Sequence, residues 1–198
     1  MKFACVVLAN GSSKRFGTDK ATYQHEGKTM VEHTIDRVKA QTLKIDKIYI
    51  NRNEPIDGLD YELSPDDSDY RSFGPLSGIL GAFITAVSNE YDYVFTVPCD
   101  SFVFPDDLFE RMYNDLKSSE TSVVFPMYND QQHCTFGIWN VFPELPSKLR
   151  RFLRSMNRYT IRIFTGNQGI PKNFLDLTDV YPSDPFININ TLEDINNL

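Results

Sequence analysis

The chain has 198 residues, of which 41% are hydrophobic and 24% are charged, and its formal net charge is −7 at pH 7. This length is enough for one α/β domain with a full core, and the negative charge argues against nucleic acid as a partner. No apolar stretch reaches the length of a membrane span and no secretory segment is visible, so we expect a cytoplasmic protein without membrane contacts. The three cysteines lie far apart, which excludes disulfide and zinc patterns.

The first predicted element is a buried strand that runs into a polar loop. Residues 3–8 form a short apolar run rich in valine, which is typical of a parallel strand buried on both faces. The loop starts with small residues over 9–13 and then carries cations at Lys14, Arg15 and Lys20. Backbone N–H groups and fixed positive charge of this kind can replace the water around a triphosphate.

The spacing of this loop excludes two common phosphate-binding motifs. Gly11 and Gly17 are one residue too far apart for a P-loop, and Thr18 stands where that motif needs lysine. A dinucleotide fingerprint needs a further glycine between the two, and none is present. The loop therefore predicts a nucleotide site of another kind.

A helix over 29–40 and a strand over 47–51 follow, and together with the first strand they predict a right-handed βαβ unit. Ligands of such sheets bind outside the carboxyl ends of the strands. We therefore expect Asn10, Asn51 and Asn53 at one edge of the sheet. After an acidic stretch over 56–73, a helix is predicted to begin at Gly74 and Pro75, where small residues suit either a nearby ligand or close packing.

The next predicted strand, residues 93–97, ends in Pro98-Cys99-Asp100. A carboxylate at the carboxyl end of a central strand is well placed to hold a metal that binds phosphates, although aspartate also caps turns and helices. Beyond it we expect a helix over 105–117, a strand over 122–127 and a helix over 145–155. Short strands are predicted over 160–164 and 174–177, and a last helix is predicted with Thr191 as its cap. The helix over 145–155 carries a set of basic residues that predict either a solvated face or a docking face for an anionic acceptor: Lys148, Arg150, Arg151 and Arg154.

Several stretches resemble the nucleotidyltransferases, and in particular the molybdenum cofactor guanylyltransferase branch. Residues 8–21 resemble the pattern L-A-G-G-x-S-x-R-[MF]-G-x-D-K-A, with Asn10 where the first glycine is usual. The segments G-P-L-S-G (74–78) and P-C-D (98–100) also match. Residues 132–139 are similar to a segment ending in H-P-x-F-G-L-W, with Cys134 in place of proline, and 186–195 are similar to F-x-N-[IV]-N-T-P-E-[DE]-L.

The resemblance implies an α/β fold, a Rossmann-like three-layer αβα sandwich with a mostly parallel central sheet, in a single nucleotidyltransferase domain over 1–198. It implies transfer of GMP from GTP to the terminal phosphate of molybdopterin cofactor, with Mg²⁺ as the metal. Molybdenum-insertion proteins or recipient molybdoenzymes would be further partners. Alternatives are a related enzyme that uses CTP or a sugar-phosphate acceptor, and a nucleotide-binding regulator without catalysis.

The resemblance also implies roles for individual residues. Arg15 and Lys20 would be catalytic, Asp100 would bind the metal, and Asp69 is an alternative to Asp67 as a nucleotide contact. The implied nucleotide-binding residues are Leu8, Ala9, Asn10, Gly11, Lys20, Asn53, Asp67, Gly74, Pro75, Gly78 and Asp100. The implied acceptor-binding residues are His133, Asn188 and Asn190.

Overall fold

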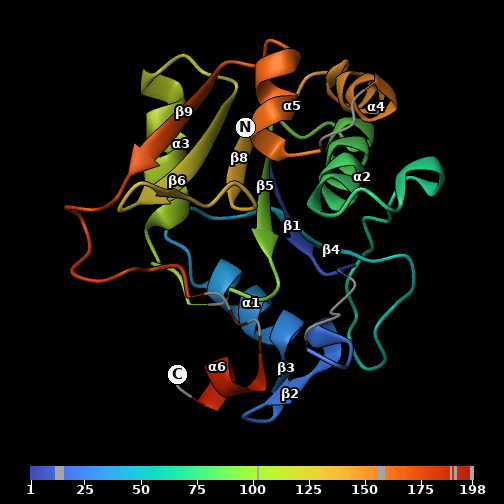
Figure 1. Ribbon diagram of the computed structural model, residues 1–198, viewed down its shortest axis with the longest axis vertical. Helices are drawn as coiled ribbons and strands as arrows, with labels where there is room; N and C mark the ends of the chain where they lie inside the picture. Colours follow the sequence, from blue (N-terminus) through green and yellow to red (C-terminus); the bar gives the residue numbers. More distant parts are fainter. Residues whose placement is uncertain (12–15, 102, 156–158, 188, 190, 197–198) are drawn as a thin grey trace.

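The computed structural model describes residues 1–11, 16–101, 103–155, 159–187, 189 and 191–196. Figure 1 shows a central sheet with helices on both faces, as predicted. The strands are β1 (Phe3–Leu8), β2 (Gln24–His25), β3 (Lys28–Thr29), β4 (Lys47–Asn51), β5 (Tyr93–Pro98), β6 (Val123–Tyr128), β7 (Gln131–Gln132), β8 (Gly137–Asn140) and β9 (Lys172–Asp176). The helices are α1 (Met30–Lys39), α2 (Pro75–Ser88), α3 (Leu108–Ser118), α4 (Leu145–Ser155), α5 (Ile161–Asn167) and α6 (Leu192–Asn196), with the 3-10 turns η1 (Lys20–Thr22) and η2 (Ser68–Tyr70).

The sheet has a parallel half and a mixed half. Its order is β4-β1-β5-β8-β6-β7, and β9 pairs with β6. β1 lies between β4 and β5 and is parallel to both, with Leu8 opposite Asn51 on one side and Pro98 on the other. β8 is antiparallel to β5 and β6, whereas β9 is parallel to β6. The carboxyl ends of β4, β1 and β5 therefore meet at one edge.

The side chains of β1 alternate between two hydrophobic cores. Cys5 and Val7 pack in the core that α1 and α3 cover. Ala4 and Val6 pack in the core that α2, α4 and α5 cover. Because both faces of β1 are buried, its sequence is an unbroken apolar run without polar alternation. Within the described residues, no helix is both long and apolar enough to cross a membrane.

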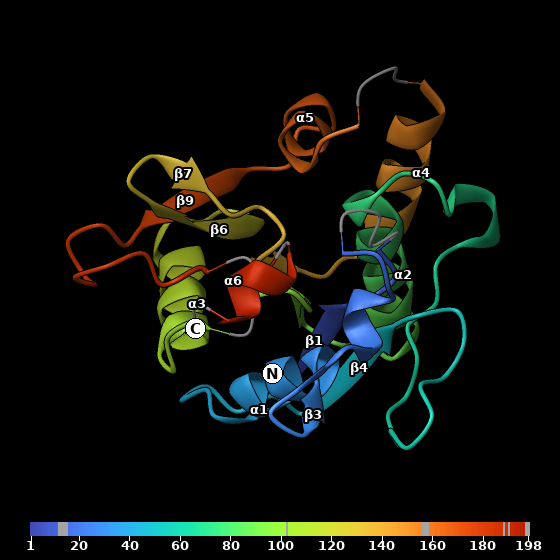
Figure 2. The same cartoon turned by 60° about the horizontal axis from the view of Figure 1, so that its bottom comes forward.

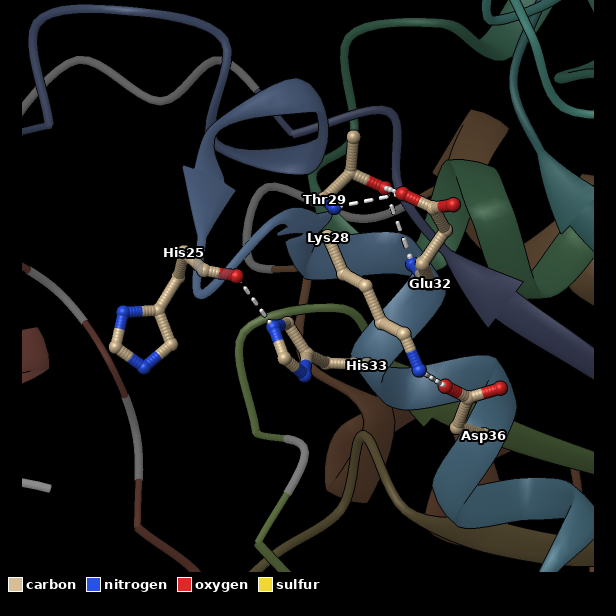
Figure 3. A network of polar contacts seen from close by, with 6 residues as sticks. All are labelled: His25, Lys28, Thr29, Glu32, His33 and Asp36. Atoms are coloured by element: carbon tan, nitrogen blue, oxygen red, sulfur yellow. Dashed lines mark hydrogen bonds and ion pairs between the residues drawn. The ribbon is translucent and has the colours of Figure 1, made fainter.

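The start of α1 is closed by a reciprocal pair of hydrogen bonds (Figure 3). The Oγ1 of Thr29 accepts from the backbone N–H of Glu32, and the carboxylate of Glu32 accepts from the backbone N–H of Thr29. The backbone N–H of Thr29 and, to a smaller extent, its hydroxyl donate to the Glu32 carboxylate, and these two bonds hold the pKa of Glu32 below its usual value. His33 also donates from Nε2 to the carbonyl of His25 over 2.8 Å, which ties the β2–β3 hairpin to α1.

Residues 160–164 form the start of α5, so the prediction of a short strand there is wrong. The Oγ1 of Thr160 accepts from the backbone N–H of Ile163, which caps the helix. Ile161 and Phe164, three residues apart, are both buried in the core beside α2 and α4. Burial of one helical face thus outweighs the β-branched composition of this segment. Elsewhere the predicted elements are confirmed within a few residues, although α3 begins at Leu108 and β9 covers 172–176.

The C-terminal segment returns to the edge where the parallel strands end. Ile187 forms an antiparallel bridge with Val103, and the backbone N–H of Ile189 donates to the carbonyl of Asp100 over 2.8 Å. Ile189 also packs against Phe16 and Met30 in a small third core. Ile195 of α6 is buried in the same core. The predicted cap of this helix is confirmed, since Thr191 and Asp194 exchange two hydrogen bonds.

Candidate active site

Three chain segments meet at the carboxyl edge of the parallel strands, which Figure 2 turns forward. The loop described at residues 9–11 and 16–19 follows β1, Arg52 and Asn53 follow β4, and Asp100 closely follows β5. Backbone pairing continues past the strand ends, because Ala9 N–H donates to the carbonyl of Asn51 over 3.3 Å. The site is thus assembled on rigid strand ends, as expected for this class of sheet.

Lys20 and Asp100 form an ion pair at the centre of this edge. Lys20 Nζ lies 3.0 Å from Asp100 Oδ2, and the two side chains are 12% and 29% exposed. Lys20 opens η1, whose N-cap Asp19 accepts from the N–H of Ala21 over 3.1 Å. The cation therefore sits at a fixed place beside a carboxylate, with the ring of Phe16 5.7 Å below it.

Asp66, which the sequence analysis did not single out, is a buried carboxylate beside the loop after β1. It is 7% exposed. Its Oδ2 accepts from Asn10 Nδ2 over 2.6 Å, and its Oδ1 accepts from Asn51 Nδ2 over 2.9 Å. Its backbone N–H donates to Asn53 Oδ1 over 3.1 Å. The three asparagines expected at one edge are therefore brought together, but through Asp66. A buried carboxylate of this kind needs such donors to offset the loss of water.

Asp67, the predicted nucleotide contact, instead has its carboxylate engaged by α4. Arg150 Nη2 and Nε lie 2.7 Å and 2.8 Å from Asp67 Oδ2. The other oxygen of Asp67 caps η2 by accepting from the N–H of Asp69. Arg154 stacks 5.8 Å from the ring of Tyr70 in the same turn. These basic side chains of α4 thus hold the segment that carries Asp66, and a nucleotide contact by Asp67 stays a prediction.

The first turn of α2 comes very close to the ends of β1 and β4. A Cβ placed on Gly78 would lie 2.4 Å from Asn51 Oδ1 and 3.0 Å from Leu8 Cδ2. Gly74, the N-cap of the helix, has φ of +59°, and Pro75 fills the first helical position. Close packing therefore accounts for Gly78, and the same packing places the helix N-terminus next to the loop.

His133 is buried under the C-terminal segment. It is 6% exposed, and its ring lies 4.4 Å from that of Phe186. Burial lowers the pKa of His133, against the opposing charge of Asp184. Among the described residues, its Nε2 has no hydrogen-bond partner. A direct contact with an acceptor would require Phe186 to move, so that role stays a prediction.

Some predicted site residues lie outside the described residues: Arg15, Asn188 and Asn190. The thiols near the site do not supply a nucleophile. Burial raises the pKa of Cys99 to about 12, and it raises that of Cys5 further. The described chemistry of the site therefore comes from Lys20, Asp100 and the amide–carboxylate network around Asp66.

Sequence reasoning missed three residues of this edge: Asn51 as a side-chain contact, Arg52 and Asp66. Asn51 ends the predicted strand and Arg52 follows it, so their position at a carboxyl end could have indicated a site residue. Asp66 gave none, because it lies in an irregular acidic stretch between β4 and α2 and only its burial distinguishes it from its neighbours.

The fold and this edge define an α/β protein of the nucleotidyltransferase type. The solved structure of molybdopterin-guanine dinucleotide biosynthesis protein A from Archaeoglobus fulgidus has the same fold, with a TM-score of 0.73 at 15% identity over 98% of this chain and 95% of that one. The molybdenum cofactor guanylyltransferase of Histophilus somni is 32% identical over 97% of this chain and 93% of its own length. That of Shewanella putrefaciens is 31% identical over 96% and 92%. The profile of the MobA-like NTP transferase domain matches residues 5–162, and the chain belongs to this family.

Proposed function

We propose that this protein transfers GMP from GTP to the terminal phosphate of molybdopterin cofactor and releases pyrophosphate in a Mg²⁺-dependent reaction. The observation that supports this most directly is the Lys20–Asp100 pair at 3.0 Å beside the loop after β1. The names of relatives that match almost the whole chain support the choice of GTP and molybdopterin.

The chain's own groups would act mainly by position and charge. An oxygen of the acceptor phosphate attacks the α-phosphorus of GTP in line, and the bond to the β-phosphate breaks so that pyrophosphate leaves with the electron pair. Because an acceptor phosphate is already ionised, the step needs no strong general base. Lys20 would stabilise the charge that grows on the leaving group, and Arg15 is proposed to assist it.

Asp100 is suited to hold Mg²⁺. Within the described residues, no cluster of three or more His, Cys, Asp or Glu side chains could hold a metal without help from a substrate. A single carboxylate fits Mg²⁺, which commonly takes one or two carboxylates and completes its shell with waters and substrate phosphates. When bound, the ion would neutralise negative charge on the phosphates. The backbone contact from Ile189 to the Asp100 carbonyl would keep the carboxylate in place.

The nucleoside would lie between the loop after β1 and the first turn of α2. The tight approach of Gly78 to Leu8 and Asn51 supports this, since it brings a helix N-terminus to the start of the loop. Backbone groups of residues 8–11 would read the base edge, with Gly74 and Pro75 on the opposite side. Asn10, bound to Asp66, leaves the Oδ1 of its amide as a further acceptor at this place.

The proposal is tested with purified protein, molybdopterin and each of GTP, CTP, ATP and UTP. Pyrophosphate release and the mass of the dinucleotide product are measured during a MgCl₂ titration. We expect product with GTP and none without Mg²⁺. Product only with CTP would replace the proposal by a cytidylyltransferase, and nucleotide binding without any product would indicate a regulator.

Variants then test the roles of the ion pair. We expect Lys20→Ala to lower kcat by at least about a hundredfold with a smaller effect on GTP affinity. Asp100→Asn should abolish the response to MgCl₂. The matched control is Lys28→Ala, which removes a lysine–aspartate pair to Asp36 at 2.6 Å on the surface (Figure 3) and should leave turnover unchanged. Native turnover in Lys20→Ala would remove Lys20 from the mechanism.

A further inference from the structure

Arg52 spans the base of the loop after β1. Its Nη1 donates to the carbonyl of Ala9 over 3.2 Å and lies 2.8 Å from Asp19 Oδ2. Ala9 begins the loop and Asp19 ends it, so one guanidinium holds both ends. The side chains of Arg52 and Asp19 are 20% and 37% exposed. Among the residues that the structure describes, the buried Nε of Arg52 has no hydrogen-bond partner, and the two polar contacts of its Nη1 both go to the loop.

The contact with Asp19 connects Arg52 to the candidate catalytic lysine. Asp19 uses one carboxylate oxygen for Arg52 and the other to cap η1, which begins at Lys20. Lys20 in turn reaches Asp100. Two neighbouring residues therefore connect this segment to the two strands that flank β1. Asp19 binds Arg52 after β4, and Lys20 binds Asp100 after β5.

These two attachments would respond differently to a bound nucleotide. If Asp100 takes a metal and Lys20 takes phosphate oxygens, their mutual ion pair is shared or given up. The Arg52–Asp19 pair involves neither group and can persist. It then remains as a polar attachment of η1 to the sheet while Lys20 works on the substrate.

We propose that Arg52 is a positioning residue that latches the loop after β1 and holds Lys20 in place once Lys20 has turned from Asp100 to the triphosphate. This inference rests on the proposed function, because it assumes that Lys20 acts on a nucleotide. It adds a residue that directly follows β4 and contacts no reacting atom. Both contacts come from the same nitrogen, Nη1, so they depend on the charge of Arg52 and on where its side chain places that nitrogen.

Two variants break the latch in different ways. Arg52→Gln removes the cation. Asp19→Asn removes the partner charge but keeps an oxygen that can still cap η1 by accepting from Ala21. The control is Lys47→Gln, which removes the Lys47–Glu62 ion pair, 2.5 Å long, at the other end of the same strand. Thermal unfolding of each variant is recorded first, and we expect small changes because these pairs are partly exposed.

Turnover and GTP affinity are then measured separately. We expect Arg52→Gln and Asp19→Asn each to lower kcat by about tenfold or more, since a small displacement of a catalytic group has effects of this size. The double variant should have a kcat no lower than that of either single variant, because both substitutions remove the same interaction. The fold loss of kcat caused by Lys20→Ala should be at least about threefold smaller in the Arg52→Gln background than in the native protein. A purely structural role for Arg52 would leave that cost unchanged.

The outcomes separate the latch from the proposed function. If the native protein transfers no GMP, the proposed function fails, and titration of a fluorescent GTP analogue still tests the latch through the same non-additivity in affinity. If the native protein is active and Arg52→Gln and Asp19→Asn keep the turnover of Lys47→Gln, the latch is refuted. Full additivity of Arg52→Gln with Lys20→Ala would also overturn it.

Discussion

Gly78→Ala offers a sharp test of how α2 and the strand ends form the site. A methyl group at this position would lie 2.4 Å from Asn51 Oδ1, about 1 Å inside an ordinary contact distance. Asn51 cannot yield easily, because it is buried and its Nδ2 donates to Ser64 O over 2.8 Å and to Asp66 Oδ1 over 2.9 Å. The substitution should therefore displace Asn51 and disturb its bond to the Asp66 carboxylate.

The expected cost follows from three contributions to the free energy of unfolding. Overpacking a well-packed site costs about 1–3 kcal/mol. Weakening a hydrogen bond to a buried charged group costs about 1.5–3 kcal/mol. Replacing glycine by alanine inside a helix returns about 1 kcal/mol. We therefore expect Gly78→Ala to be less stable than the native protein by about 1.5–5 kcal/mol and to bind GTP more weakly.

Urea unfolding followed by circular dichroism, with a GTP titration, measures both effects. The matched control is Gly166→Ala in α5, where an added Cβ meets no atom within 4 Å. That variant should be as stable as the native protein, or more stable by up to about 1 kcal/mol, with native GTP affinity. If Gly78→Ala unfolds at the same urea concentration as Gly166→Ala and keeps native GTP affinity, the packing argument is refuted.

Three further outcomes are expected. Thr29→Ala should lower the free energy of unfolding in urea by about 1–2 kcal/mol through loss of the α1 cap, whereas Thr29→Ser should keep most of it. Because burial lowers the pKa of His133, the unfolded chain binds more protons than the folded one just below pH 6.5, so the free energy of unfolding should fall with acidification through that range. His133→Phe should show a smaller fall, and an equal fall in both proteins would contradict the assignment. Asn10→Gly removes a donor to Asp66 and should weaken GTP binding several-fold, measured by titration, while guanine stays preferred. Unchanged GTP affinity would mean that this hydrogen bond does not contribute to nucleotide binding.

Local patterns were sufficient to predict most elements and the sheet edge at which Lys20 and Asp100 lie. β1 and β5 are recognisable as unbroken apolar runs because they are buried on both faces. Asp100 closely follows β5 and Lys20 lies in the segment after β1, so the rule that parallel strands present ligands at their carboxyl ends places both residues at one edge, whereas the ion pair between them is seen only in the structure. Where one buried face of a helix carried β-branched residues, as in α5, the local pattern misled.

The arrangement around the loop depends on contacts between residues far apart in the chain. Asp66 reaches Asn10 across 56 positions, and Arg52 reaches Asp19 across 33. Neither contact has a local signature, because a buried carboxylate and an exposed one look alike in an acidic stretch. Backbone pairing of Leu63 with Ile50 of β4 and the close approach of α2, which requires Gly78, together place the irregular segment before α2 beside the strand ends. The tertiary packing therefore determines which carboxylate faces the loop and which is held by Arg150 of α4.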